Sequence, residues 1–188
     1  MPEEKVTPPN VAIGLTNPKS PTNVGAIMRA SGCFQVNSIV YTGNRYNRAA
    51  KFHTDTMNAI NHIPLTHVDD LLENAPEGAK VICVELVEGA TPLPKFKHPE
   101  NAFYIFGPED ASIKKQVLRR ADEVVYIPTI GCMNLAATVN VVLYDRLAKS
   151  DLSFANDELI RNSRDVNNNA TIHRITKKAG RSDEAKRK

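Results

Sequence analysis

The sequence has no long apolar run and little cysteine. Nowhere among its 188 residues is there a stretch near the roughly 18 apolar residues that a membrane-spanning helix needs. Residues 1–10 lack the basic and apolar blocks of a signal peptide. The three cysteines, Cys33, Cys83 and Cys132, show neither a C-x-x-C pair nor a histidine at zinc-ligand spacing. We therefore expect a cytoplasmic protein without membrane spans, disulfides or a metal.

Glycine is scarce where a dinucleotide-binding loop would need it. The stretch "SPTNVGAIMRASG" (20–32) follows the apolar run "VAIGLT" and holds Asn23, Gly25 and Arg29. A Rossmann-type loop needs three glycines in the pattern G-x-G-x-x-G, which this stretch does not contain, so that kind of site is disfavoured. The permanently charged guanidinium of Arg29 suits a phosphate or an oxygen that gains negative charge.

The chain does contain an ordinary apolar fraction and an uneven distribution of charge. Hydrophobic residues make up 41% of it, which is typical of a globular domain. Residues 166–188 carry a net charge of +5, which leaves −2 for the rest. We expect a flexible lead-in over 1–10, one domain over 11–150, and over 151–188 a helix plus a basic tail. That tail either contacts phosphates or is simply solvated.

Short β-branched runs alternate with helical patterns along most of the chain. Strands are predicted at 11–15, 38–42, 80–86, 101–107 and 123–128, and helices at 22–34, 66–75, 111–121 and 134–149. Residues 43–63 are predicted to form a loop with a little helix. This alternation predicts an α/β fold with a parallel sheet covered by helices on both faces. Ligands bind such sheets beyond the carboxyl ends of the strands.

Three loops at predicted strand ends therefore attract attention. The first is the stretch 20–32. The second, "FGPED" (106–110), puts Glu109 and Asp110 at the start of the next predicted helix, where acidic residues also stabilise the helix dipole. The third, "IPTIGCMN" (127–134), turns through Gly131 and reaches Asn134, which can simply cap the following helix.

Taken together, the three loops resemble the ordered motifs of the SpoU (TrmH-like) branch of the SPOUT methyltransferases. "NVGAIMR" (23–29) resembles the first motif, N-x-G-x-I-x-R, and "FGPE" (106–109) resembles the second, F-G-x-E. "IPTIGCMNLAATVNVVLYDRL" (127–147) resembles the third, in which I-P-M is followed by a loop, S-L-N or S-M-N and an apolar helix. The resemblance covers residues 10 to 150.

The resemblance implies S-adenosylmethionine-dependent methylation of RNA, generally at a ribose 2′-oxygen, by a homodimer. It also implies a C-terminal deep trefoil knot, the SPOUT α/β knot. Carried over by position, the implied catalytic residues are Arg29, Asn23, Glu109 and Asn134, with Arg29 as an orienting and electrostatic group rather than a base. The implied cofactor-binding residues are Leu86, Gly107, Ile127, Cys132 and Met133.

The RNA target is not readable from the sequence. The resemblance favours tRNA over rRNA, because compact relatives modify tRNA and only about ten residues precede the first predicted strand. Basic residues in two segments are candidates for RNA contact, although the first segment is equally compatible with a solvated loop. These candidates are Arg45, Arg48, Lys51, Lys177 and Lys178.

The chain departs from the family pattern in its third motif. Thr129 replaces the usual methionine, Cys132 and Ala136 replace serines, and the loop before Cys132 is shorter than in the family. Loss of a hydroxyl removes a hydrogen bond of about 1 kcal/mol. A non-catalytic RNA-binding protein that retains the fold is therefore the alternative, and an unrelated α/β nucleotide enzyme is a third. Titration with S-adenosylmethionine separates the first two hypotheses.

Overall fold

The computed structural model describes residues 9–50 and 63–172 of the chain. The chain divides into two compact units, Met1–Asp151 and Leu152–Lys188. Lys51, Lys177 and Lys178, predicted to contact RNA, lie outside the described residues. Within the described ranges, no helix combines the length and apolar character needed to cross a membrane.

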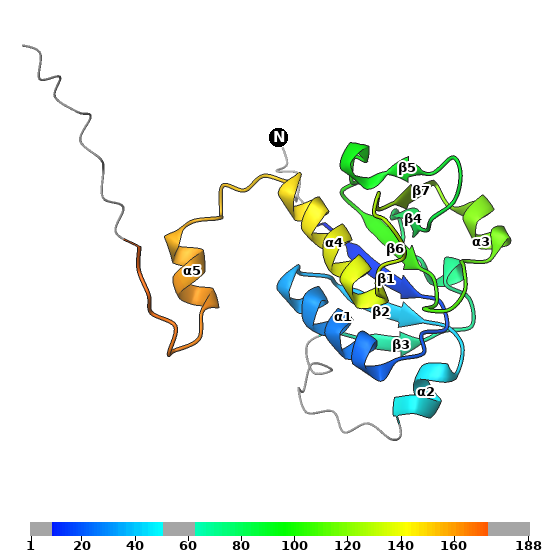
Figure 1. Ribbon diagram of the computed structural model, residues 1–188, viewed down its shortest axis with the longest axis horizontal. Helices are drawn as coiled ribbons and strands as arrows, with labels where there is room; N and C mark the ends of the chain where they lie inside the picture. The colour runs from blue at the N-terminus through cyan, green and yellow to red at the C-terminus, as the bar shows by residue number, and fades with distance from the viewer. Residues whose placement is uncertain (1–8, 51–62, 173–188) are drawn as a thin grey trace, which may run out of the picture. The chain divides into compact units, whose positions relative to one another are not determined.

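The centre of the first unit is a parallel sheet (Figure 1). In the described part of the chain seven strands pair in the order β3-β2-β1-β6-β4-β7-β5, so strands far apart in sequence become neighbours. The predicted parallel sheet is confirmed. The strands are β1 (Val11–Leu15), β2 (Ser38–Tyr41), β3 (Leu65–His67), β4 (Lys80–Val84), β5 (Thr91–Pro92), β6 (Ala102–Phe106) and β7 (Glu123–Tyr126).

Two long helices, α1 (Pro21–Cys33) and α4 (Leu135–Ala148), pack side by side over one face of the sheet (Figure 1). Ser20 caps α1 by accepting the N–H of Asn23, and Pro21 follows with its φ already suited to a helix. Apolar side chains of both helices meet alternate strand residues in the main core. The helix side chains in this core include Val24, Ile27, Met28, Val139, Val142 and Leu143.

Shorter elements cover the opposite face. The single 3-10 turn η2 (Leu72–Asn74) and helix α3 (Lys115–Arg120) pack beside a smaller core built on Phe103, Ile105 and Cys83. Burial, assisted by the charge of Glu85, raises the pKa of the Cys83 thiol to about 12. Cys83 is therefore a protonated core residue. Helices on both faces of the sheet are confirmed.

The predicted helix over 66–75 is wrong. Thr66 belongs to β3, which pairs with β2. Asp70 then makes a turn in which its Oδ1 accepts the N–H groups of Leu72 (2.7 Å) and Glu73 (3.3 Å), and only η2 follows. Strand pairing at the sheet edge outweighed the local capping signal, as tertiary context often does.

The helix predicted over 111–121 is shorter than expected, because α3 begins only at Lys115. The N–H of Ile113 is bound by the Glu85 carboxylate instead of taking part in a helix. Glu109 and Asp110 consequently lie outside α3. The remaining helical elements are α2 (Arg45–Ala50), the 3-10 turn η3 (Leu93–Lys95) and, in the second unit, α5 (Asp157–Ser163).

A polar cluster joins the end of α4 to the segment after η3. The His98 side chain is 4% exposed; its Nε2 lies 2.8 Å from Asp145 Oδ2 and its Nδ1 lies 2.6 Å from the Tyr104 hydroxyl. Since a carboxylate only accepts, Nε2 carries the proton and Nδ1 accepts from Tyr104. Burial lowers the pKa of His98 against the opposing effect of Asp145. The neutral imidazole is therefore favoured in the folded protein.

The strand order decides where the three loops begin. Leu15 at the end of β1 and Val84 at the end of β4 both pair with Phe106 at the end of β6. Strand β7 pairs with β4 on its other side. The loops after these strands therefore leave the sheet at the same edge. The trefoil knot implied by the resemblance stays a prediction.

Candidate active site

Three side chains, one from each motif, are joined by hydrogen bonds. Asn134 Nδ2 donates to Asn23 Oδ1 over 3.0 Å, and Asn23 Nδ2 donates to Glu109 Oε1 over 3.1 Å. Asn23 is 111 positions from Asn134 and 86 from Glu109 in the sequence. The fold thus brings together three of the four implied catalytic residues, here named the Asn23–Glu109–Asn134 cluster.

The hydrogen bonds of this cluster allow one orientation of each amide. Asn134 caps α4, and its Oδ1 accepts the N–H groups of Ala136 (2.9 Å) and Ala137 (3.2 Å). Its Nδ2 is therefore the group directed at Asn23. The Glu109 carboxylate only accepts, so Asn23 must present Nδ2 to Glu109 and Oδ1 to Asn134. Capping, which the sequence offered as an alternative role for Asn134, coexists with its place in the cluster.

Glu109 holds the segment that enters α1. Its Oε2 accepts the N–H of Lys19 at 2.9 Å and its Oε1 accepts that of Ser20 at 3.1 Å. Burial raises the pKa of Glu109, but hydrogen bonds from its own backbone N–H, Lys19, Asn23 and Ser20 outweigh burial and bring the pKa below its ordinary 4.5. The proposed alternative role, stabilising the helix that follows Glu109, is wrong because that helix begins at Lys115.

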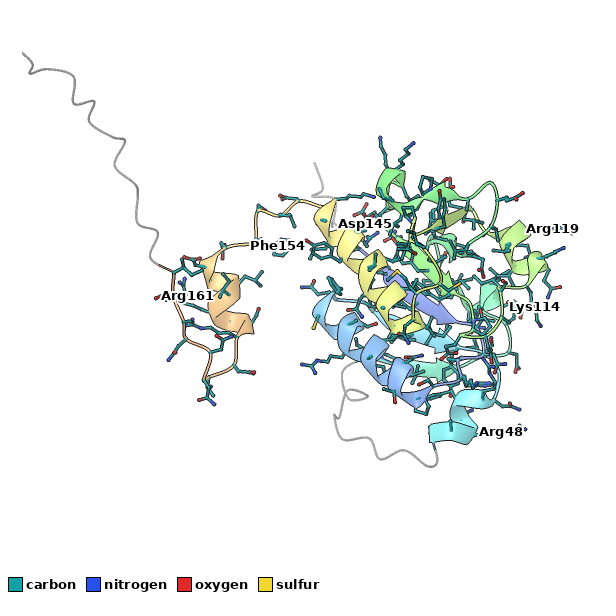
Figure 2. The ribbon with its side chains drawn as sticks, viewed as in Figure 1. Arg48, Lys114, Arg119, Asp145, Phe154 and Arg161 are labelled. Atoms are coloured by element: carbon teal, nitrogen blue, oxygen red, sulfur yellow. The ribbon has the colours of Figure 1, made fainter. Side chains whose placement is uncertain are left out.

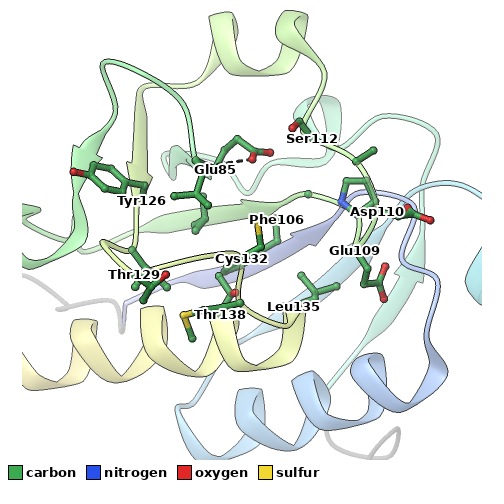
Figure 3. A pocket seen from close by; sticks show the side chains of 17 residues that line it. Glu85, Phe106, Glu109, Asp110, Ser112, Tyr126, Thr129, Cys132, Leu135 and Thr138 are labelled. Atoms are coloured by element: carbon green, nitrogen blue, oxygen red, sulfur yellow. Dashed lines mark hydrogen bonds between the residues drawn. The ribbon is translucent and has the colours of Figure 1, made fainter.

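A pocket of about 410 Å³ lies beside this cluster (Figure 3). Its volume falls in the roughly 300–1,000 Å³ range of small-molecule sites. All five residues implied for cofactor binding line it, together with Glu109. Gly131 turns the third loop with φ +88°, a conformation that favours glycine, and the Thr129 hydroxyl donates to its carbonyl at 3.1 Å. The shorter third loop therefore still closes one side of a pocket.

The charged side chains of the pocket lining are all acidic. Three carboxylates line it, those of Glu85, Glu109 and Asp110, and the lining residues include no lysine, arginine or histidine. The other lining residues are apolar or neutral; they include Leu86, Phe106, Ile127, Met133 and Leu135. This lining suits a ligand with an apolar body and a positive charge.

The sequence analysis missed Glu85. It is the first residue after β4, and its carboxylate accepts the N–H of Leu86 at 3.1 Å through Oε1 and that of Ile113 at 2.8 Å through Oε2. A Cβ at Gly107 would lie 3.2 Å from Glu85 Oε2, so the glycine of "FGPE" leaves room for this carboxylate. The rule that ligands bind beyond strand ends, applied to the strand at 80–86, could have found Glu85.

Arg45 is tied into the loops beside the pocket. Its Nη1 contacts both Asp110 carboxylate oxygens at 2.7 and 2.9 Å, while Nε and Nη2 donate to the Asn17 carbonyl at 3.0 and 2.7 Å. The hydrogen bond from Arg45 is the main reason that the pKa of Asp110 lies below its ordinary value. The Arg45 side chain is 28% exposed, so these internal contacts occupy much of the group predicted to bind RNA.

Arg29 does not join the pocket of its own chain. It lies six residues after Asn23 on α1, about 9 Å further along the helix axis. Arg29 is exposed and is not part of the pocket lining.

Among the residues that the structure describes, no group of three or more His, Cys, Asp or Glu is placed to hold a metal ion.

A parallel α/β domain with a pocket at the carboxyl ends of its central strands belongs to the class of folds that bind a small ligand at this edge. The chain belongs to the SpoU rRNA Methylase family, whose sequence profile matches residues 10–144. The resemblance read from the three motifs is therefore confirmed at the level of the family.

Individual relatives agree with this assignment. An uncharacterized tRNA/rRNA methyltransferase of Mycobacterium leprae is 28% identical over 145 residues, which are 73% of this chain and 47% of the relative. The chain thus spans about half the length of that relative.

Solved structures share the fold. A structure described as giving insight into the 2-OH methylation of C/U34 on tRNA has a TM-score of 0.64 at 24% identity and covers 76% of this chain and 92% of its own. The SpoU methyltransferase AviRb of Streptomyces viridochromogenes, in complex with AdoMet, has a TM-score of 0.61 at 16% identity, covering 77% of this chain and 59% of its own.

Proposed function

We propose that this protein is an S-adenosylmethionine-dependent RNA methyltransferase that acts on a ribose 2′-oxygen. One observation carries the proposal: residues of the second and third family motifs line a pocket that holds carboxylates and apolar groups but no basic side chain, and Asn23 of the first motif is hydrogen-bonded to both of these motifs. Family membership supplies the reaction class, and the pocket supplies a site of suitable size and charge.

The pocket chemistry fits S-adenosylmethionine better than a phosphate-bearing cofactor. A nucleotide phosphate would meet three carboxylates and no cation in the lining. S-adenosylmethionine carries a net positive charge and an apolar adenine face. Leu86, Ile127 and Met133 are the lining residues that would pack on the base, with the carboxylates facing the charged part. When bound, S-adenosylmethionine supplies a sulfonium methyl group that needs no further activation.

The residues of the chain would then mainly position the acceptor. Aligned reactants can supply about 7–11 kcal/mol of barrier lowering. The Asn23–Glu109–Asn134 cluster fixes the start of α1 and of α4 at the pocket and keeps the Glu109 charge in place. A cation beside the ribose oxygen would stabilise its developing negative charge, which is the role we propose for Arg29.

Because Arg29 lies outside the pocket of its own chain, we propose that it serves the pocket of a second copy in a homodimer. The outer surface of α1 and α4 supports this proposal. It exposes the small residues Gly25, Ala26 and Ala137 and also Tyr144, which is 63% exposed. Aromatic side chains such as that of Tyr144 are enriched at protein–protein interfaces. Mixing an inactive Arg29→Ala chain with an inactive Glu109→Gln chain should restore activity in heterodimers.

For RNA contact we propose the basic surface of α2 and α3. Arg48, Lys114 and Arg119 lie along one edge of the first unit (Figure 2), the edge toward which the β1 and β2 arrows point in Figure 1. Lys114, Lys115, Arg119 and Arg120 are all exposed, and the sequence analysis did not select them. A tRNA substrate is favoured, since one structure sharing the fold concerns tRNA methylation.

Two measurements test the proposed function. Calorimetric titration with S-adenosylmethionine should detect binding to the full chain. Transfer of labelled methyl groups to total tRNA and to rRNA, followed by alkaline hydrolysis, should place the label on a ribose 2′-oxygen, because that linkage then resists cleavage. RNA binding without S-adenosylmethionine binding would overturn the proposal and favour the non-catalytic alternative.

A further inference from the structure

Glu85 lines the pocket, and two backbone N–H groups hold its carboxylate in place. Each of its oxygens accepts one backbone N–H, from Leu86 and from Ile113, and the side chain packs against Gly107 (Figure 3). Each oxygen has further acceptor capacity beyond these single bonds. The position of this negative charge is therefore set by β4 and by the loop before α3.

Of the three pocket carboxylates, Glu85 is the one without a basic partner among the described residues. Asp110 is paired with Arg45 at 2.7 Å and Lys19 at 3.8 Å, and Glu109 lies 3.8 Å from Arg45. No ion pair within 4.0 Å joins a described basic side chain to Glu85. Its charge is thus available to a cationic ligand, which a partly buried carboxylate favours.

We propose that Glu85 is a specificity-determining residue that makes the pocket prefer the cationic methyl donor to its neutral product. This inference rests on the proposed function. Methyl transfer breaks the S–C bond, leaves the electron pair on sulfur, forms the C–O bond and releases the hydroxyl proton to solvent. The sulfonium charge is lost in that step. Glu85 therefore attracts the incoming S-adenosylmethionine and no longer attracts the sulfur of S-adenosylhomocysteine.

The experiment compares affinity ratios. The dissociation constants for S-adenosylmethionine and S-adenosylhomocysteine are measured by calorimetry for the wild type, Glu85→Gln and Glu85→Asp. A charge interaction of this kind changes the preference for the cationic ligand by about tenfold. Glu85→Gln should lose that preference, while Glu85→Asp, which keeps the charge, should retain most of it. Sinefungin carries an ammonium group near the sulfonium position, so its affinity should respond to each substitution as the affinity for S-adenosylmethionine does.

A matched control is Glu88→Gln, which removes the same charge from an exposed residue outside the pocket lining and should leave the ratio unchanged. Equal weakening of all three ligands by Glu85→Gln would assign the residue a merely structural role and overturn the inference. An unchanged ratio in Glu85→Gln would overturn it as well. If Glu85→Gln does not fold, the wild type alone provides the test. Equal affinities of the wild type for S-adenosylhomocysteine, S-adenosylmethionine and sinefungin would then overturn the inference.

These outcomes differ from failure of the proposed function. If the wild type binds none of the three ligands, the cofactor assignment itself fails. If the wild type binds them and Glu85→Gln keeps the ratio, only the role of Glu85 fails. Thermal unfolding of each variant shows that the compared proteins are folded.

Discussion

Replacing Glu109 by glutamine tests whether the cluster holds the loops together. The carboxylate accepts from Lys19, Ser20 and Asn23 with two oxygens, whereas an amide has one oxygen and one donor group. In either orientation the new N–H₂ group faces at least one backbone N–H. The Glu109 side chain is 17% exposed, so water replaces the lost bond poorly.

We therefore expect Glu109→Gln to cost about 2 kcal/mol, the loss of one hydrogen bond to a charged group. For a protein of this size, that corresponds to a melting temperature lower by about 4–8 °C. Differential scanning calorimetry at pH 7 measures this, with Glu88→Gln as the control for loss of an exposed charge. A melting temperature within about one degree of the wild type would refute the reasoning.

The pH dependence gives an independent check. Because the pKa of Glu109 is lowered in the folded protein, its contribution to stability is present above the ordinary value of 4.5 and is lost as the pH falls through the folded pKa. The difference in melting temperature between wild type and Glu109→Gln should be full at pH 7 and shrink below pH 4.5. A difference that grows in acid would show that the carboxylate is not stabilised by these contacts.

Three further predictions concern other parts of the chain. Arg29→Ala should abolish methyl transfer yet leave S-adenosylmethionine affinity within a few fold; near wild-type turnover would contradict the role of Arg29. Removing residues 166–188 should weaken RNA binding and reduce its salt dependence, and equal affinities at several salt concentrations would exclude that contact. Because burial lowers the pKa of His98 below 6.5, the melting temperature of the wild type should decline as the pH falls below 6.5. In His98→Gln the part of this decline that comes from protonation of His98 should be missing.

Local signals predicted most elements because their apolar patterns agree with the fold. The runs at 11–15 and 101–107 are buried strands at the centre of the sheet, and the long apolar helix before Lys149 is present as α4. The prediction failed at 66–75, where an edge strand and a turn at Asp70 replaced a helix. Edge pairing depends on β2, a partner that the local pattern does not contain.

The sequence alone determined the family, the parallel α/β class and the five pocket residues implied for cofactor binding, because the motifs follow strand ends and the carboxyl ends of parallel strands share one edge. Tertiary structure decided which groups the site side chains contact. It placed Glu109 on Asn23 and Lys19 rather than at the start of α3, committed Arg45 to Asp110, and put Glu85 in the pocket lining with its carboxylate on the N–H of Ile113. These contacts join residues distant in the chain, so they depend on strand order and on which loop a carboxylate meets after folding.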